Sequence, residues 1–270
     1  MRSIHIIMLT VMVLFAALMP ANAGSFERVA KNGVLRCGYF VWPPYFMKDP
    51  NSGQLSGINY DQTETMAKLL DLKVEWVAEI GAGEVVSALN SGKIDIMCTS
   101  LWPDPARMKL LTLTKPLFFT PAYAYVRAGD KKFSGKHISL NQSDVKFAGI
   151  EGDLTYSVVK NNFPKAKLLA LPQNADPAQL LLNLTSGKAD VVVMDEAFAR
   201  DYAKTNPGKI QKLSDVGAIQ VYPESFAIQQ GEAQFKNMLD AAIETIVSSG
   251  QSKEILSRYE HYSFAPKPGF

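Results

Sequence analysis

Asn90-Ser91-Gly92-Lys93-Ile94-Asp95 and Thr185-Ser186-Gly187-Lys188-Ala189-Asp190 are two nearly identical segments of one chain. Each follows a leucine-rich segment typical of a helix and runs into a short apolar stretch, Ile96-Met97-Cys98 or Val191-Val192-Val193-Met194. A glycine that closes a helix before a buried apolar run indicates a helix–turn–strand unit. Two copies predict two similar α/β lobes. The cleft between two lobes is where a ligand can bind.

The first residues read as a targeting segment. Arg2 precedes an apolar run from Ile6 to Leu18, and Ala21-Asn22-Ala23 matches a small-x-small cleavage site. We interpret residues 1–23 as a secretory signal peptide and expect a soluble mature chain in the periplasm. A membrane anchor is the weaker interpretation, because the run is short of the about 20 residues that span a bilayer.

Charge and metal-ligand content exclude several function classes. The 270 residues carry a net charge of +2 and no basic run, which argues against a nucleic-acid partner. None of the three histidines adjoins a cysteine, so we expect no metal site. We expect no cofactor either. Cys37 and Cys98 both fall in predicted buried strands. Export permits a disulfide between them, but two buried thiols fit the same pattern.

Helix and strand patterns alternate along the chain as in parallel α/β lobes. Strands at 122–126 and 221–228 are predicted to cross between the lobes and form the hinge. The prediction is therefore an α/β fold with two lobes, each a mostly parallel sheet flanked by helices. Lobe 1 takes residues 24–124 and 225–270, and lobe 2 takes residues 125–224. The other predicted strands are 34–39, 74–77, 94–99, 147–150, 167–171 and 191–194; the predicted helices are 60–70, 84–89, 155–162, 177–184, 233–249 and 252–259.

Two charged residues follow the repeated strands. Arg107 comes after the first and Asp195 after the second, and ligands of open α/β sheets bind beyond the carboxyl ends of strands. A guanidinium can clamp a carboxylate with paired hydrogen bonds, although Arg107 equally fits a solvated surface. Asp195 can hold an ammonium group, or cap a helix over residues 196–204, or do both.

Other candidates stand at predicted strand ends. Asp153 and Thr155 open a predicted helix, where they can contact a ligand or cap the helix. Trp42, Tyr45 and Trp102 can sandwich an organic ligand or hold an ammonium on their ring faces. Ordinary core packing is the alternative for these three aromatics. We find no nucleophile elbow, Walker sequence or dinucleotide fingerprint.

The chain from about residue 32 to 259 resembles the family 3 extracellular solute-binding proteins, the polar amino-acid receptors of ABC importers. The resemblance rests on the order and spacing of short matches. These are Gly33-Val34-Leu35-Arg36-Cys37-Gly38, Trp42-Pro43-Pro44-Tyr45, Gly57-Ile58-Asn59-Tyr60-Asp61, Ser91-Gly92-Lys93-Ile94-Asp95, Pro105-Ala106-Arg107, Gly149-Ile150-Glu151-Gly152 and Ser186-Gly187-Lys188-Ala189-Asp190.

The resemblance implies the type II periplasmic-binding-protein fold and a site for a zwitterion. Arg107 and Ser100 match positions that bind an α-carboxylate, Thr155 matches a lobe 2 hydroxyl, and Asp195 matches the carboxylate that takes the α-amino group. Trp102 departs from the family, which usually has Ser or Thr there. This aromatic substitution favours a larger, flatter or modified amino compound.

The expected function is thus a monomeric receptor that delivers an amino-acid-like solute to the membrane subunits of an ABC permease. An enzyme on the same fold is the alternative. Cyclohexadienyl dehydratases resemble these receptors, and Glu151 or Asp153 is then the candidate general acid. A sensory module for a signalling partner is a third possibility.

Overall fold

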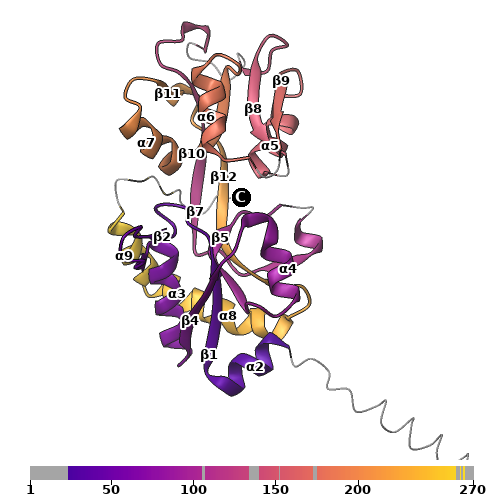
Figure 1. Ribbon diagram of the computed structural model, residues 1–270, viewed down its shortest axis with the longest axis vertical. Coiled ribbons are helices and arrows are strands. Elements are labelled where there is room, and N and C mark those ends of the chain that lie inside the picture. Colours follow the sequence, from indigo (N-terminus) through magenta and orange to yellow (C-terminus); the bar gives the residue numbers. More distant parts are fainter. Residues whose placement is uncertain are drawn as a thin grey trace, which may run out of the picture.

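A computed structural model describes residues 24–104, 107–133, 140–151, 153–172, 175–259, 262 and 264. The predicted signal peptide, residues 1–23, lies outside the described residues. The chain forms two α/β lobes, one above the other in Figure 1. The two-lobed α/β prediction is confirmed.

Lobe 1 holds both the N-terminal and the C-terminal elements (Figure 1). Its strand β1 pairs in parallel with β4 and β5, and helices cover the sheet. A small hairpin, β2–β3, follows β1 and was not predicted. The elements are α2 (Ser25–Asn32), β1 (Val34–Tyr39), β2 (Met47–Lys48), β3 (Leu55–Ser56), α3 (Ile58–Leu69), β4 (Lys73–Glu79), η1 (Ala82–Glu84), α4 (Val85–Asn90), β5 (Ile96–Leu101), η2 (Arg107–Lys109), β6 (Leu111–Leu113), α8 (Ala233–Ser248) and α9 (Gln251–Ser257).

Lobe 2 repeats the arrangement, with β8 parallel to both β10 and β9. Most predicted elements agree with the observed ones to within two residues, whereas the short strand β11 was not predicted. The elements are η3 (Lys131–Phe133), β8 (Lys146–Ile150), α5 (Leu154–Asn162), β9 (Lys167–Leu171), α6 (Ala178–Thr185), β10 (Val191–Asp195), α7 (Glu196–Thr205), β11 (Ile210–Lys212) and η5 (Ser214–Val216).

Two long strands run through both lobes, where two shorter crossing strands were predicted to form the hinge. The strands β7 (Phe118–Arg127) and β12 (Ala218–Gln229) pair antiparallel, with Thr120 opposite Tyr222. In lobe 1 β12 also pairs with β5, and in lobe 2 β7 also pairs with β10, so the strand order is β4-β1-β5-β12-β7-β10-β8-β9. The predicted lobe boundaries after residues 124 and 224 fall inside these two strands.

The repeated segment has the same structural role in each lobe. Gly92 and Gly187 end their helices with φ of 68° and 79°, in the left-handed region that favours glycine. Asp95 donates its backbone N–H to the Arg36 carbonyl, and its side chain accepts the Arg36 N–H at 2.9 Å. Asp190 makes the same two bonds with Lys146, the second at 3.0 Å. Each aspartate therefore fixes its central strand to the neighbouring strand.

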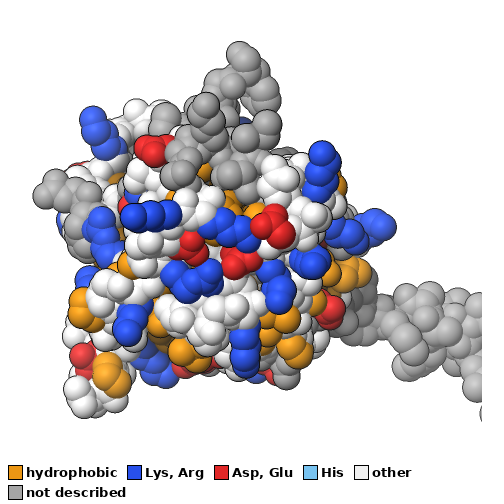
Figure 2. Space-filling model, turned by 90° about the horizontal axis from the view of Figure 1, so that it is seen from above, with side chains coloured by type: hydrophobic (Ala, Val, Ile, Leu, Met, Phe, Trp, Pro, Cys, Tyr) orange, Lys and Arg blue, Asp and Glu red, His pale blue; other side chains and the backbone are white. Residues whose placement is uncertain are grey.

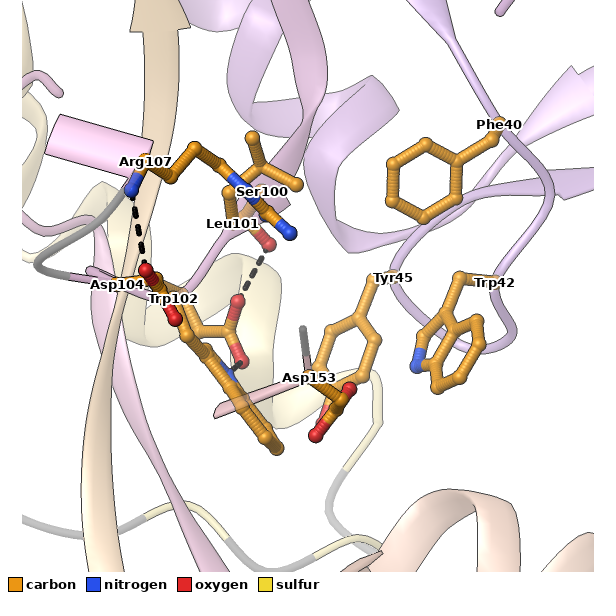
Figure 3. Close-up of a pocket in the computed structure, with 10 residues that line it drawn as sticks. Phe40, Trp42, Tyr45, Ser100, Leu101, Trp102, Asp104, Arg107 and Asp153 are labelled. Atoms are coloured by element: carbon orange, nitrogen blue, oxygen red, sulfur yellow. Dashed lines mark hydrogen bonds between the residues drawn. The ribbon is translucent and has the colours of Figure 1, made fainter. Parts of the chain in front are cut away.

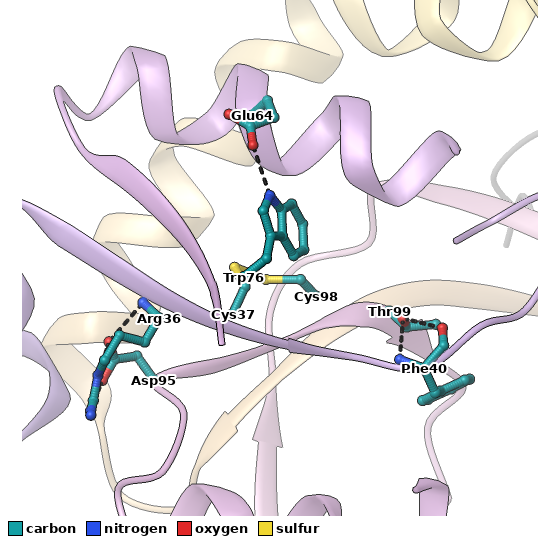
Figure 4. Close-up of a disulfide and its surroundings, with 8 residues drawn as sticks. All are labelled: Arg36, Cys37, Phe40, Glu64, Trp76, Asp95, Cys98 and Thr99. Carbon is teal, nitrogen blue, oxygen red and sulfur yellow. Dashed lines mark hydrogen bonds and ion pairs between the residues drawn. A yellow bond between two sulfur atoms is a disulfide. The ribbon is translucent and has the colours of Figure 1, made fainter. Parts of the chain in front are cut away.

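Cys37 and Cys98 form a disulfide (Figure 4). They lie on the adjacent strands β1 and β5 with Cα atoms 5.6 Å apart, inside the lobe 1 core. The indole of Trp76 lies beside the bridge and donates to Glu64 Oε1 at 3.0 Å. Of the two alternatives that the sequence left open, the structure has the bridged form.

Candidate functional site

A pocket of 170 Å³ opens where the two lobes meet the crossing strands (Figure 3). Six of the eight predicted site residues line it: Trp42, Tyr45, Ser100, Trp102, Arg107 and Asp153. Phe40, Leu101, Asp104 and Glu224 complete the wall. Asp153 comes from lobe 2 and Glu224 from β12, so residues distant in sequence converge on one cavity.

Arg107 begins the short helix η2, beyond the end of β5. Its backbone N–H donates to Asp104 Oδ1 at 3.0 Å. Its side chain is half-buried and points into the pocket, as Figure 3 shows. The guanidinium makes no hydrogen bond or ion pair with any described residue, so its donors are available to a ligand.

Glu224 is a pocket residue that the sequence analysis missed. It lies in β12, is only 3% exposed, and accepts three hydrogen bonds from uncharged donors. Burial raises the pKa of its carboxyl, although the three hydrogen bonds act in the opposite direction. The available signal was an acid inside the predicted crossing strand 221–228. The donors are Ser100 Oγ at 2.7 Å, Trp102 Nε1 at 2.6 Å and Thr120 Oγ1 at 2.6 Å.

Asn59, near the start of α3, holds Ser100 from the other side. Its Oδ1 accepts the backbone N–H of Ser100 at 3.0 Å and lies 3.0 Å from Ser100 Oγ. Asn59 is fully buried and Ser100 nearly so. The serine hydroxyl therefore links the Glu224 carboxyl to the Asn59 amide.

Asp195 and Thr155 lie outside the residues that line the pocket. Asp195 ends β10 and caps α7 by accepting the Phe198 N–H at 2.9 Å, the capping role that the sequence had offered as one option. It is 3% exposed, and burial raises its pKa to about 7. Its predicted role toward an amine stays a prediction.

The start of α5 uses its polar groups internally. Asp153 caps this helix by accepting the Thr155 N–H at 2.7 Å. The Thr155 hydroxyl also donates to Asp153 Oδ1, so its one hydrogen is already used. In this structure Thr155 supports Asp153, and Asp153 is the one that faces the pocket.

The aromatic candidates join the two lobes. Trp42 stacks on Phe198 of α7 with ring centroids 5.3 Å apart. Trp102 stacks on Tyr222 of β12 at 4.0 Å and packs against the lobe 2 core. Both rings also line the pocket, so the core and binding interpretations of these residues are compatible.

The fold and this pocket agree with a match to a protein family. The model of the bacterial extracellular solute-binding proteins, family 3, matches residues 35–261. The chain belongs to this family. A probable histidine-binding protein of Neisseria gonorrhoeae is 26% identical over 246 residues, which cover 90% of this chain and 86% of the relative. An L-arginine-binding protein of Pseudomonas aeruginosa is 23% identical over 230 residues, covering 81% and 84%.

A solved structure supports the same family fold. An ancestral amino acid-binding protein, described as a precursor of cyclohexadienyl dehydratase, superposes with a TM-score of 0.70 at 26% identity. The match covers 87% of this chain and 99% of the ancestral one. Across the described residues, no helix of this family member is long and apolar enough to cross a membrane.

The low net charge and the lack of a basic run were the sequence argument against nucleic acid. Figure 2 looks down on the end of the molecule formed by lobe 2, where Lys and Arg side chains are scattered and interleaved with Asp and Glu. Nucleic-acid sites usually gather basic side chains on one face. Among the described residues in this view, Asp and Glu side chains lie between the basic ones. The described part of the chain contains no cluster of three His, Cys, Asp or Glu side chains suited to a metal ion.

Proposed function

We propose that this chain is a periplasmic receptor that binds a small amino-acid-like solute and delivers it to an ABC permease. Arg107 is the observation that carries the proposal. Its unpartnered guanidinium faces a pocket that also contains Asp153 and the buried Glu224. A ligand with a carboxylate and an amine meets complementary charges there.

Closure of the lobes is the proposed mechanism. Residues 24–124 and 225–270 move as one unit and residues 125–224 as the other, about β7 and β12. A ligand that contacts both units stabilises the closed state but not the open one, so it shifts the population toward closure. The permease then recognises the closed, loaded monomer.

A ligand screen tests the receptor proposal. Purified protein is heated with each common amino acid and with related amines, and its unfolding midpoint is recorded. A true ligand at 100 times its dissociation constant stabilises the protein by about 2.7 kcal/mol. Stabilisation by none of these compounds would overturn the proposal. Light scattering after gel filtration measures whether the protein is a monomer. Uptake of the ligand by cells that lack the receptor, compared with cells that contain it, tests the transport role.

We propose further that neither Glu151 nor Asp153 is the general acid of a dehydratase. Glu151 is exposed and does not line the pocket, and Asp153 is engaged in capping α5. Neither residue therefore resembles a desolvated general acid. Purified protein is incubated with prephenate or arogenate and the products are separated. Turnover above background would favour the enzyme alternative.

A further inference from the structure

Glu224 is a buried acid without a positively charged partner. Its three donors, Ser100, Trp102 and Thr120, are all uncharged. No Lys, Arg or His of the described residues forms an ion pair with it, although Arg107 lines the same pocket. An ionised carboxylate buried without a cation is unstable, so it takes up a proton or attracts a cation.

The hydrogen bonds around Ser100 favour one protonation state of the Glu224 carboxyl. The Ser100 hydroxyl carries one hydrogen but faces two oxygens, Glu224 Oε2 at 2.7 Å and Asn59 Oδ1 at 3.0 Å. The Asn59 atom must be oxygen, because it accepts the Ser100 backbone N–H. With Glu224 ionised, the hydroxyl hydrogen can lie in only one of these two contacts, and the other brings two oxygens together with no hydrogen between them. With Glu224 protonated, its O–H donates to Ser100, and Ser100 donates to Asn59.

The other carboxylate oxygen agrees with this assignment. Glu224 Oε1 accepts from both Trp102 and Thr120, as the carbonyl oxygen of a neutral carboxylic acid does. All four contacts of the carboxyl group and its serine are thus satisfied at once. The geometry fits a proton on Oε2.

We propose that Glu224 takes the cationic group of the ligand and exchanges its proton for that cation. The step is balanced: the neutral acid and an ammonium or guanidinium group become a carboxylate–cation pair, and one proton passes to solvent. This inference rests on the proposed receptor function. It assigns to Glu224 the role that the sequence had given to Asp195, which keeps its position as the cap of α7.

The surroundings of Glu224 favour a cation. The other ionisable groups near the carboxyl are Arg107 and Asp104 of lobe 1, Asp153 and Asp195 of lobe 2, and the Tyr45 hydroxyl. Acids outnumber the single arginine. The aromatic faces of the pocket, Trp42 among them, attract cations as well. Arg107 remains for a carboxylate of the same ligand.

Calorimetry with L-arginine and with L-histidine tests the exchange. Each titration is run near pH 6 in two buffers of different ionisation enthalpy, which gives the number of protons released. The wild-type protein should release protons, and its affinity should fall by up to about tenfold for each pH unit of acidification. Glu224→Gln should bind at least about tenfold more weakly and lose most of that proton release.

Glutamine is the matched replacement, because its amide donates to Ser100 and its carbonyl accepts from Trp102 and Thr120, as the neutral acid does. Asp195→Asn is the competing variant, and exposed Glu254→Gln is the charge control. Both should keep the proton release that Glu224→Gln loses. Unchanged affinity and proton release in Glu224→Gln, or their loss in Asp195→Asn alone, would overturn the exchange while leaving the receptor function standing.

A measurement without ligand completes the test. Carbon-13 NMR of glutamate-labelled protein, compared with Glu224→Gln, identifies the Glu224 carboxyl signal. It should remain protonated at a pH where exposed glutamates are ionised. Titration together with the exposed glutamates would overturn the proposal. Failure of every amine and amino acid to bind the wild-type protein would overturn both this inference and the receptor function.

Discussion

Trp42 and Phe198 stack across the boundary between the lobes, with ring planes 18° apart and centroids 5.3 Å apart. Trp42 belongs to the loop after β1, whereas Phe198 lies in the first turn of α7. The Phe198 N–H is also the donor that Asp195 accepts. The cap at the end of β10 therefore positions the ring that contacts lobe 1.

Removal of this stack should favour the open form. Aromatic pairs contribute roughly 0.5–1.5 kcal/mol beyond their buried area. Phe198→Ala should weaken ligand binding by at least about that amount and increase the radius of gyration measured by small-angle X-ray scattering without ligand. Phe198→Tyr keeps the ring and should behave as the wild-type protein. Equal radii for all three proteins would show that the contact does not hold the lobes together.

Arg107→Ala should abolish most ligand binding without harming the fold. The guanidinium has no partner among the described residues, so its loss breaks no internal bond. A ligand carboxylate left without its counter-charge costs roughly 2–5 kcal/mol. Calorimetry measures the affinity and thermal unfolding measures stability. Arg107→Lys keeps the charge but loses the paired geometry, and should lie between the two. Wild-type affinity in Arg107→Ala would refute this assignment.

Asp195 makes stability depend on pH. Its pKa of about 7 in the folded chain lies above the ordinary value of 3.8, so between these values the folded state holds more protons than the unfolded state. The free energy of unfolding should therefore fall as pH rises from about 4 to about 7, by up to roughly 4 kcal/mol. Asp195→Asn still accepts the Phe198 N–H and should flatten this dependence. Urea unfolding across the range measures it; equal slopes would contradict the shifted pKa.

Periodicity and turn residues predicted the lobes well, because each helix–turn–strand unit is specified locally. Strand 34–39 and strand 167–171 were predicted with their observed bounds. The hairpin β2–β3 and strand β11 were missed, since two or three residues carry no measurable period. The crossing of β7 and β12 was predicted from two apolar runs on either side of the lobe 2 segment.

The site was predicted less completely, because convergence of distant residues is a property of the fold. Arg107 and Ser100 could be found near a strand end. Glu224 could not, since its role arises only when β12 lies beside Ser100, Trp102 and Thr120. Asp195 and Thr155 were expected at the ligand, whereas the structure uses both in helix caps and leaves their ligand roles as predictions.

The disulfide should contribute substantially to stability. Cys37 and Cys98 are 61 positions apart, and closing a loop of this length in the unfolded chain is worth about 4 kcal/mol in the chain-entropy model. A reductant should lower the urea midpoint of the wild-type protein. The double variant Cys37→Ala, Cys98→Ala should have the lower urea midpoint without reductant, and adding reductant should not change it. Ligand affinity should survive, because neither cysteine lines the pocket. An identical wild-type midpoint with and without reductant would contradict the prediction.

The two repeated aspartates should matter for stability and not for binding. Asp95 is 1% exposed and pairs with Arg28 and Arg36, whose side chains are 27% and 26% exposed, so Asp95→Asn leaves two half-buried guanidinium groups without their counter-charge and should cost up to roughly 3–5 kcal/mol. The Asp190 side chain is 20% exposed where it pairs with Arg127, so water replaces part of the lost interaction and Asp190→Asn should cost less. Urea unfolding gives both costs, and calorimetry should give wild-type affinity, because neither residue lines the pocket.

Asp144 is the surface control. This exposed acid pairs with Lys132, and Asp144→Asn should change stability by less than about 1 kcal/mol. Loss of ligand affinity in a still-folded Asp95→Asn or Asp190→Asn protein would mean that the repeat belongs to the site and not only to the strands that carry it.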